Sequence, residues 1–248
     1  MKQTLGYIRQ ADRDFSLLAH DDQVAVGLSG GKDSLLLLKA LSLYRLFSHK
    51  DYALGAFTVD PGFGFDPAPL TEYCRALQVP FHFLPGAVAE KAAGEVAEGK
   101  APCHLCARNR RGILYKHAAA LGYHKVALGH HRDDVLETFL LGLFYEGRLH
   151  ALPPKSFLSR RDITVIRPLL YLPERHIASA VRRLQLPVQT SPCPFDGHTQ
   201  RSEMKALIQE LSRRYPQADD MMFAALRNRG GYRLWPGEGE PLGPENRP

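Results

Sequence analysis

Short apolar runs alternate with longer segments of helical periodicity along most of the chain. An apolar run of about four to eight residues between turn residues predicts a buried strand, and apolar positions at helical spacing predict a helix. The predicted strands are 23–28, 52–59, 81–84, 125–128 and 163–167, and the predicted helices are 33–47, 67–77, 105–121, 133–145 and one opened by Pro173-Glu174. Because helices separate successive strands, a doubly wound α/β fold with a parallel sheet is expected.

Changes in this pattern divide the chain into four parts. They are an N-terminal segment (1–20), the α/β domain (21–186), a loop followed by two helices (187–229) and a tail rich in Gly and Pro (230–248). The two terminal helices, predicted at 201–215 and 218–228, form a small appendage on the α/β domain. A loose helix or mobile loop is expected at 87–100, and the tail is expected to be poorly ordered.

Composition narrows the classes of protein and partner. The chain has 248 residues, 44% of them hydrophobic, which is enough for one sizeable core. Its net charge of +6 favours an acidic partner such as a nucleotide or a nucleic acid, although a solvated basic surface without a partner fits the charge equally well. The first residues lack the apolar core of a signal peptide, and no run approaches the roughly 20 apolar residues of a membrane span. We therefore expect a soluble, cytoplasmic protein with no membrane association.

The most informative motif is Ser29-Gly30-Gly31-Lys32-Asp33-Ser34, between a predicted strand and a predicted helix. A Gly-Gly pair at such a turn lets backbone N–H groups and the positive end of the helix face an anion, for which phosphate is the natural candidate. Lys32 adds a charge, and Ser29 and Ser34 add hydroxyls. Because three residues rather than four separate Gly27 from Gly31, and Asp33 follows Lys32, this is not a Walker A loop. The alternative is a helix cap with chance glycines.

The four cysteines are too few for a disulfide scaffold and are expected to be ligands or core residues. Cys103 and Cys106 have the spacing of zinc sites, iron–sulfur sites and redox pairs. Cys193 lies in a loop and is the more available third ligand, whereas Cys74 lies in an amphipathic helix and fits a core position. Three thiolates can hold a four-iron cluster with one open iron. A zinc site completed by His104 or His198 remains an equal alternative.

Several stretches together resemble the tRNA 2-thiocytidine synthetase branch of the N-type ATP pyrophosphatases, the PP-loop superfamily. The stretches are Ser29 to Ser34, Pro102 to Tyr115 with its two cysteines, Ala127 to Thr138 with Gly-His-His-Arg-Asp-Asp, Pro153-Pro154-Lys155 and Arg167-Pro168-Leu169. The resemblance makes residues 21–186 an ATP pyrophosphatase domain. It implies thiolation of a cytidine in the tRNA anticodon loop, with ATP and a [4Fe-4S] cluster as cofactors and Cys103, Cys106 and Cys193 as cluster ligands.

The resemblance also implies roles for single residues. Lys32 and the loop amides would stabilise the departing pyrophosphate, with Mg²⁺ bridging the phosphates, and Arg110 would face both cluster and substrate. Asp134, with Asp133 behind it, would transfer a proton or position a metal, unless the two merely cap a helix. Further expected nucleotide contacts are Gly129 and His130 in the same turn and Val59 and Asp60 at the end of the second strand, although Asp60-Pro61-Gly62 is equally an ordinary turn.

The expected partners follow from the same resemblance. They are tRNA, bound through part of the basic clusters at 108–111, 160–161, 182–183 and 213–214, a sulfur donor such as a cysteine desulfurase or free sulfide, and a second copy of the chain in a homodimer. One departure from the family pattern is Asp196, where many members carry another cysteine. Two rival interpretations are another PP-loop adenylating enzyme, such as a 2-thiouridine or lysidine synthetase, and a non-catalytic nucleotide- or RNA-binding module with structural zinc.

Overall fold

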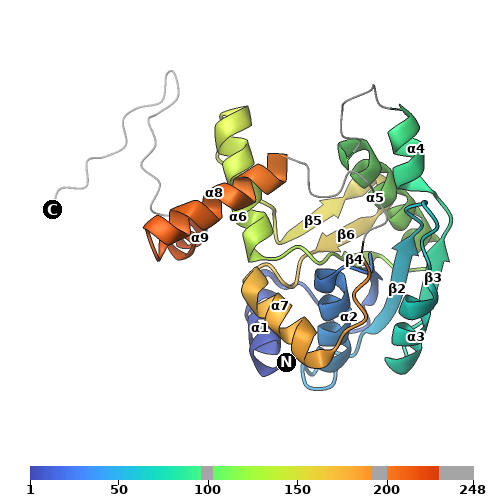
Figure 1. The fold of residues 1–248 in the computed structure, drawn as a ribbon. Coiled ribbons are helices and arrows are strands. Elements are labelled where there is room, and N and C mark those ends of the chain that lie inside the picture. Colours follow the sequence, from blue (N-terminus) through green and yellow to red (C-terminus); the bar gives the residue numbers. More distant parts are fainter. Residues whose placement is uncertain (96–102, 191–199, 229–248) are drawn as a thin grey trace.

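One six-stranded sheet forms the centre of the protein (Figure 1). The computed structural model describes residues 1–95, 103–190 and 200–228. The strands are β1 (Gln23–Gly27), β2 (Ala53–Val59), β3 (Phe81–Leu84), β4 (Lys125–Ala127), β5 (Lys155–Leu158) and β6 (Ile163–Ile166), and they lie in the order β3-β2-β1-β4-β6-β5. All neighbours pair in parallel except β5, which runs antiparallel to β6 at one edge.

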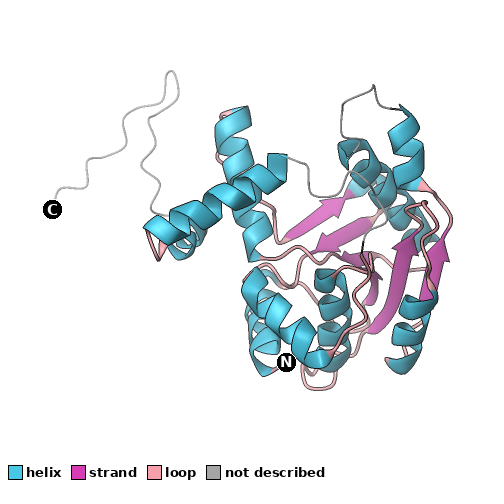
Figure 2. Cartoon of the chain, in the orientation of Figure 1, coloured by secondary structure: helices cyan, strands magenta, loops and turns pink. Residues whose placement is uncertain are grey.

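Helices cover both faces of this sheet (Figure 2). They are α1 (Lys2–Phe15), α2 (Lys32–Tyr44), α3 (Ala68–Ala76), α4 (Val88–Glu95), α5 (Cys103–Ala120), α6 (Arg132–Leu141), α7 (Glu174–Leu184), α8 (Gln200–Arg214) and α9 (Ala218–Arg227), with a π-helical turn η1 (Gly142–Glu146) and a 3₁₀ turn η2 (Ser159–Arg161). Side chains alternate across each strand, so Val24 and Val26 enter the larger core while Ala25 enters the smaller core under α4 and α5. The doubly wound α/β fold is confirmed.

Two elements were not anticipated from the sequence. Helix α1 falls in the segment given no structure, and its buried positions include the polar Thr4 and Asp12 beside Ile8 and Ala11. Asp12 is satisfied inside the protein because it accepts hydrogen bonds from the Tyr44 hydroxyl and the Leu18 N–H, both at 2.9 Å. Strand β5 is the antiparallel edge strand, and its weak alternation of exposed and half-buried residues gives little sequence signal.

The remaining predicted elements agree with the structure to within a few residues. The segment expected to be a loose helix or loop contains α4, and the helix expected at 133–145 divides into α6 and η1. The C-terminal helices α8 and α9 pack on α6 and add Met204, Ile208 and Phe223 to the larger core. The predicted third ligand Cys193, with Asp196, His198 and the tail from residue 230, lies outside the described residues.

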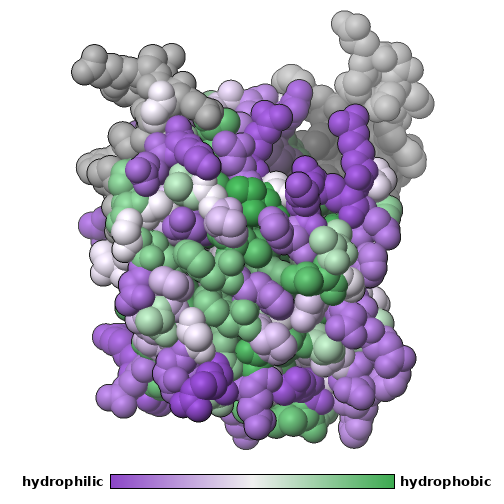
Figure 3. Space-filling model, turned by 90° about the vertical axis from the view of Figure 1, so that its right-hand side faces the viewer, coloured by the Kyte–Doolittle hydropathy of each residue, from purple (hydrophilic) through white to green (hydrophobic). Residues whose placement is uncertain are grey.

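The face on the β3 side carries a band of hydrophobic residues across its middle (Figure 3). Phe83 of β3 and Phe63, which follows β2, are among the exposed large hydrophobic side chains. Phe83 stacks on Phe65, with ring centroids 6.3 Å apart, so this edge of the sheet is joined to the loop after β2. Within the described residues, no helix is both long and apolar enough to cross a membrane.

Candidate active site

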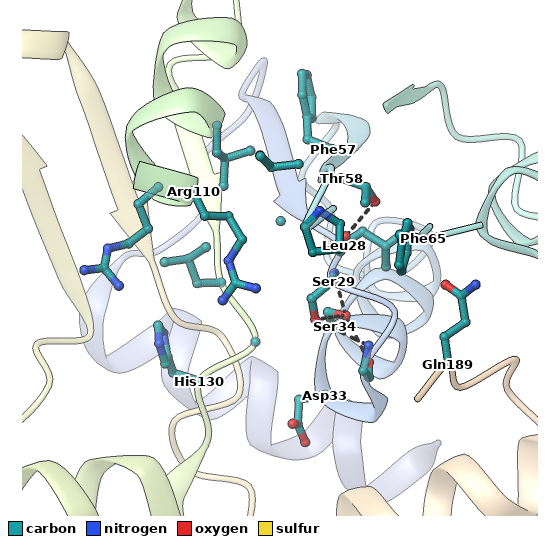
Figure 4. Close-up of a pocket in the computed structure, with 18 of the residues that line it drawn as sticks. Leu28, Ser29, Asp33, Ser34, Phe57, Thr58, Phe65, Arg110, His130 and Gln189 are labelled. Carbon is teal, nitrogen blue, oxygen red and sulfur yellow. Dashed lines mark hydrogen bonds between the residues drawn. The ribbon is translucent and has the colours of Figure 1, made fainter. Parts of the chain in front are cut away.

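A cavity of about 490 Å³ opens at the carboxyl ends of β1 and β4 (Figure 4). These two strands are neighbours, but the chain leaves β1 toward β2 and leaves β4 toward β6, so the cavity lies where the direction of winding reverses. Open α/β sheets bind ligands at such a point. Its described lining residues are Gly27, Leu28, Ser29, Gly31, Asp33, Ser34, Phe57, Thr58, Val59, Pro61, Phe65, Arg110, Arg111, Leu114, Leu128, Gly129, His130, Asp134, Gln189 and Thr190.

The loop from Ser29 to Ser34 is held in shape by its own two hydroxyls. Ser34 Oγ donates to the Gly31 carbonyl at 2.9 Å and accepts from the Ser29 N–H at 3.1 Å (Figure 4). Gly30 has a φ of 82°, a backbone conformation that residues with a side chain rarely adopt. Gly31 is the N-cap of α2. The first N–H groups of α2 have no acceptor within the helix, so this end of α2 suits a phosphate group.

The turn after β4 packs directly against the phosphate loop. A Cβ atom on Gly129 would lie 3.1 Å from both the Asp33 carbonyl carbon and the Ser34 backbone nitrogen. Both neighbours are backbone atoms, which cannot rotate away as a flexible side chain can. Gly129 therefore lets β4 approach the start of α2, and the two predicted cofactor-binding segments meet at the cavity.

Lys32 is directed toward α7 rather than into the cavity. Its Nζ lies 3.0 Å from Glu174 Oε1 and 3.2 Å from Asp33 Oδ2. Burial alone would lower the pKa of Lys32, but these two carboxylates outweigh it and raise the pKa, so the side chain is charged at neutral pH. Lys205 of α8 also contacts Glu174, at 2.8 Å. Glu174 thus holds two lysines beside the phosphate loop.

His131 lies among three carboxylates beside this loop. Its side chain is 6% exposed, with Nε2 at 3.7 Å from Asp33 and 3.4 Å from Asp134, and Nδ1 at 3.6 Å from Asp133. Burial lowers the pKa of His131, but the close approach of Asp133 and the charges of Asp134 and Asp33 raise it by more. A protonated His131 would neutralise part of this acidic group.

The two predicted acidic residues occupy different places. Asp134 lines the cavity, and its Oδ2 accepts the His131 N–H at 2.8 Å, which caps α6. Asp133 Oδ2 accepts the Glu174 N–H at 2.8 Å, and Asp133 is not among the lining residues of the described chain. Asp133 therefore fixes the start of α7, whereas Asp134 is the acid beside the substrate space.

The opposite wall of the cavity is basic. Arg110 and Arg111 of α5 line it together with His130, and Arg110 and His130 lie on the same side of the cavity in Figure 4. Burial lowers the pKa of His130 to about 4, with a further contribution from nearby arginines, so this imidazole is neutral at neutral pH. Charge on this wall therefore comes from the two exposed arginines.

A third part of the cavity suits the nucleoside of a nucleotide. Val59, Pro61 and Phe65 line it near the end of β2, and Gln189 and Phe65 lie together on the side away from Arg110 (Figure 4). Asp60 is not among the described lining residues, and its Oδ1 instead accepts the Gly62 N–H at 2.8 Å. Asp60 thus takes part in an ordinary turn, which was the alternative to a nucleotide contact for this residue.

Comparisons with known proteins agree with this geometry. The family model for the PP-loop domain, ATP_bind_3, matches residues 6–212. The tRNA-cytidine(32) 2-sulfurtransferase of Methylococcus capsulatus is 41% identical over 225 residues, which cover 88% of this chain and 76% of the relative. The enzyme of the same name from Burkholderia mallei is 40% identical over 231 residues, covering 92% of this chain and 69% of the relative.

The chain belongs to the PP-loop family of tRNA-cytidine(32) 2-sulfurtransferases. A PP-loop domain is an ATP-binding domain, which agrees with a phosphate loop at the cavity. The U34-tRNA thiolase NcsA from Methanococcus maripaludis, solved with its [4Fe-4S] cluster, has the same fold, with a TM-score of 0.73 and 23% identity over 92% of this chain and 77% of that chain. The predicted family and fold are confirmed.

In this PP-loop sulfurtransferase family member, the cysteines fall into two kinds. Cys74 is completely buried in the larger core, as predicted. Cys103 and Cys106 are half-buried in the first turn of α5, and an i, i+3 pair lies on one helix face, with about 5–6 Å between Cβ atoms. Within the described residues, no group of three His, Cys, Asp or Glu side chains could hold a metal ion. The pair therefore fits a cluster or a zinc ion as two ligands of a larger set.

Several residues of the site were missed from the sequence. Glu174 pairs with Lys32, Arg201 pairs with Asp134, and Phe65 and Gln189 line the nucleoside part of the cavity. Gln189 also donates its backbone N–H to the Gly30 carbonyl at 3.0 Å. These residues come from segments that only the folded chain brings to the loop, and no local motif marks them.

Proposed function

We propose that this protein uses ATP to activate a cytidine of tRNA and then replaces the 2-oxygen of the base by sulfur. The observation that carries this proposal is the presence of two unlike walls around one cavity. One wall is the phosphate loop at the start of α2, and the other is α5, which bears the cysteine pair and two arginines. The relatives named tRNA-cytidine(32) 2-sulfurtransferase support cytidine as the target.

The first step is adenylation of the base. The carbonyl oxygen of cytidine attacks the α-phosphorus of ATP, a new O–P bond forms, and the bond to the β-phosphate breaks to release pyrophosphate. The first N–H groups of α2, with Ser29 and Ser34, would hold the leaving phosphates, and Lys32 would turn from Glu174 toward them. When bound, Mg²⁺ would reduce the negative charge of the phosphates.

The adenosine would lie against Val59 and Phe65, so that the α-phosphate faces the middle of the cavity. The cytosine would enter from the side of Arg110 and Arg111, whose guanidinium groups can bind the α-phosphate and the RNA backbone. Asp134 also lines the cavity. It is the acid available to orient the base or to receive a proton from it.

The second step replaces the activated oxygen by sulfur. A sulfur nucleophile adds to C2 of the base, and AMP leaves with the former carbonyl oxygen. Cys103, Cys106 and a third thiolate, for which we propose Cys193, would hold a [4Fe-4S] cluster, which would supply iron as a carrier for the sulfide. Cys103, Cys106, Arg110 and Leu114 share one face of α5, and the last two line the cavity. Cys106 precedes Arg110 by about 6 Å along the helix axis, at 1.5 Å per residue.

Free sulfide, or sulfide released by a thiol reductant from the persulfide of a cysteine desulfurase, would supply the sulfur, and a homodimer would be the assembled form. A lysidine synthetase or another PP-loop adenylating enzyme would share the first step but needs no thiol ligands. The pair at the start of α5, on the face that reaches the cavity, favours sulfur transfer over that alternative.

The decisive experiment follows both products in one reaction. Anaerobically purified protein is incubated with ATP labelled at the α-phosphate, sulfide and unmodified tRNA, and nucleotides and digested nucleosides are separated. The proposal expects labelled AMP, unlabelled pyrophosphate and 2-thiocytidine, all dependent on tRNA. Formation of ADP, or AMP release that does not depend on tRNA, would contradict it. Formation of 2-thiouridine alone would assign the protein to the other thiolation branch.

A further inference from the structure

One arginine of the C-terminal helices contacts the carboxylate of Asp134, which lines the cavity. Arg201, near the start of α8, donates from Nη1 to Asp134 Oδ1 at 2.8 Å and from Nη2 to Thr138 Oγ1 at 3.1 Å. Its Nη1 also lies 3.6 Å from Glu137 Oε2. The guanidinium group therefore contacts three residues on one face of α6, and one of them lines the cavity.

These contacts are not required to hold α8 on the protein. Met204 and Ile208 of the same helix are buried in the larger core, and Leu207 packs against it. Arg201 lies at the end of α8 that meets the site, with its side chain 40% exposed. Hydrophobic burial fixes the helix, so the charged contacts of Arg201 are available for a separate role.

That role concerns the two carboxylates that Arg201 joins. Asp134 and Glu137 lie one turn apart on α6, and Glu137 is 4% exposed. Burial and the nearby Asp134 raise the pKa of Glu137 to about 7, so above that pH the two carboxylates carry like charges, which repel each other unless a cation lies between them. Without Arg201, rotation of Asp134 away from Glu137 would relieve the repulsion but would also remove its carboxylate from its place at the cavity.

We propose that Arg201 is a positioning residue that holds the Asp134 carboxylate at the cavity and so sets the rate of base adenylation. The inference rests on the proposed function, because it assigns the step that Arg201 affects. This role is distinct from nucleotide binding, because the contacts of Arg201 among the described residues are with α6 and not with the phosphate loop or the residues that line the nucleoside part of the cavity.

The test compares Arg201→Met, which keeps the length of the side chain but not its charge, with Arg201→Lys and with Arg75→Met. Arg75 forms an exposed pair with Glu72 on α3, far from the acidic group in the sequence and the fold, and serves as the matched control. For R201M we expect kcat of tRNA-dependent pyrophosphate release to fall by about 10- to 100-fold, as for other small misplacements of site groups. The Kd for ATP should change by less than about threefold, and R201K should recover most of the rate.

A second substitution distinguishes positioning from a merely structural contact. In R201M at about pH 9, above the raised pKa of Glu137, adding Glu137→Gln removes the like charge, so the double variant should regain at least about fivefold of the lost rate. A wild-type rate in R201M, or a loss confined to ATP binding, would overturn the inference. The inference would also be overturned if E137Q did not restore the rate of R201M and R201M had a lower melting temperature than R75M.

A structural measurement makes the inference independent of activity. In a crystal structure of R201M, the Asp134 side chain should leave its present position, whereas in R75M it should keep it. An unchanged Asp134 in R201M would overturn the inference even if the wild type thiolated no tRNA. Absence of tRNA-dependent pyrophosphate release from the wild type would instead contradict the proposed function.

Discussion

The two walls of the cavity are built in different ways. The phosphate-loop wall is one contiguous hexapeptide, and its hydroxyls and backbone bond mainly to one another. The α5 wall presents side chains along a helix, with two thiols at its first turn and two arginines farther on. A local motif can encode the first wall almost completely, whereas the second becomes a site only when other segments fold against it.

This difference implies a division of labour that substitutions can test. Changes in the phosphate loop should stop ATP cleavage and leave bound iron in place. Changes at the thiols should remove bound iron and leave ATP cleavage in place, because the cysteines are not among the described residues that line the nucleotide cavity. If a change on either wall removes both properties through unfolding, the comparison fails.

The largest effect is expected for Cys106→Ser. A serine hydroxyl is a poor ligand for iron, so bound iron and 2-thiocytidine formation should fall below detection while the Kd for ATP stays within about twofold. Iron analysis, nucleoside analysis and calorimetric ATP titration measure these properties. Cys74→Ala is the control, because Cys74 lies in the core and should alter stability without loss of iron. Thiolation by C106S at the wild-type rate would remove this cysteine from the site.

A loss of about 100-fold or more in pyrophosphate release is expected for Lys32→Met. Removing one charged donor to a leaving group typically costs about 10²- to 10³-fold in kcat. Lys39→Met, on the same helix, is the matched control. In the present structure Lys32 contacts Asp33 and Glu174, so the result also tests whether it turns to the phosphates when ATP binds. Equal rates for the two variants would exclude Lys32 from catalysis.

Gly129→Ala should weaken ATP binding by about tenfold. The new Cβ would lie 3.1 Å from backbone atoms of Asp33 and Ser34, so the phosphate loop would have to shift away from the turn after β4. Gly112→Ala on α5 is the control, because nothing lies within 4 Å of its Cβ position and alanine favours a helix. ATP affinity in G129A equal to that in G112A would show that the two segments need not approach so closely.

The smallest effect is a change in stability at Glu137. Burial and the nearby Asp134 raise the pKa of this carboxyl to about 7. Between pH 4.5 and 7 the unfolded chain therefore loses a proton that the folded protein keeps, and Glu137 makes stability fall as pH rises. Glu137→Gln lacks this dependence. The free energy of unfolding of Glu137→Gln minus that of the wild type should therefore rise by about 1–2 kcal/mol between pH 4.5 and pH 8. Urea unfolding at both pH values measures this, and a constant difference would contradict the raised pKa.

How far the sequence predicted the molecule depends on how local each signal is. All strands except β5, the phosphate loop and the turn at Gly129 were found because their residues are adjacent in the chain. Helix α1 was missed because its buried face contains Thr4 and Asp12, and Asp12 is satisfied only by distant groups such as Tyr44. Arg201 and Glu174 were missed because nothing near them in sequence marks their approach to Asp134 and Lys32. The orientation of Lys32 toward α7 also depended on a distant partner.

The central claim is that one cavity joins ATP cleavage to sulfur transfer, and single-turnover stoichiometry tests it most directly. Anaerobically purified wild-type protein is first analysed for iron and sulfide, then mixed with sulfide and with limiting ATP and tRNA, and AMP and 2-thiocytidine are measured in the same samples. The account predicts about four iron and four sulfide per chain and one 2-thiocytidine for each AMP. A colourless zinc protein that still forms 2-thiocytidine, or AMP released without 2-thiocytidine, would contradict it.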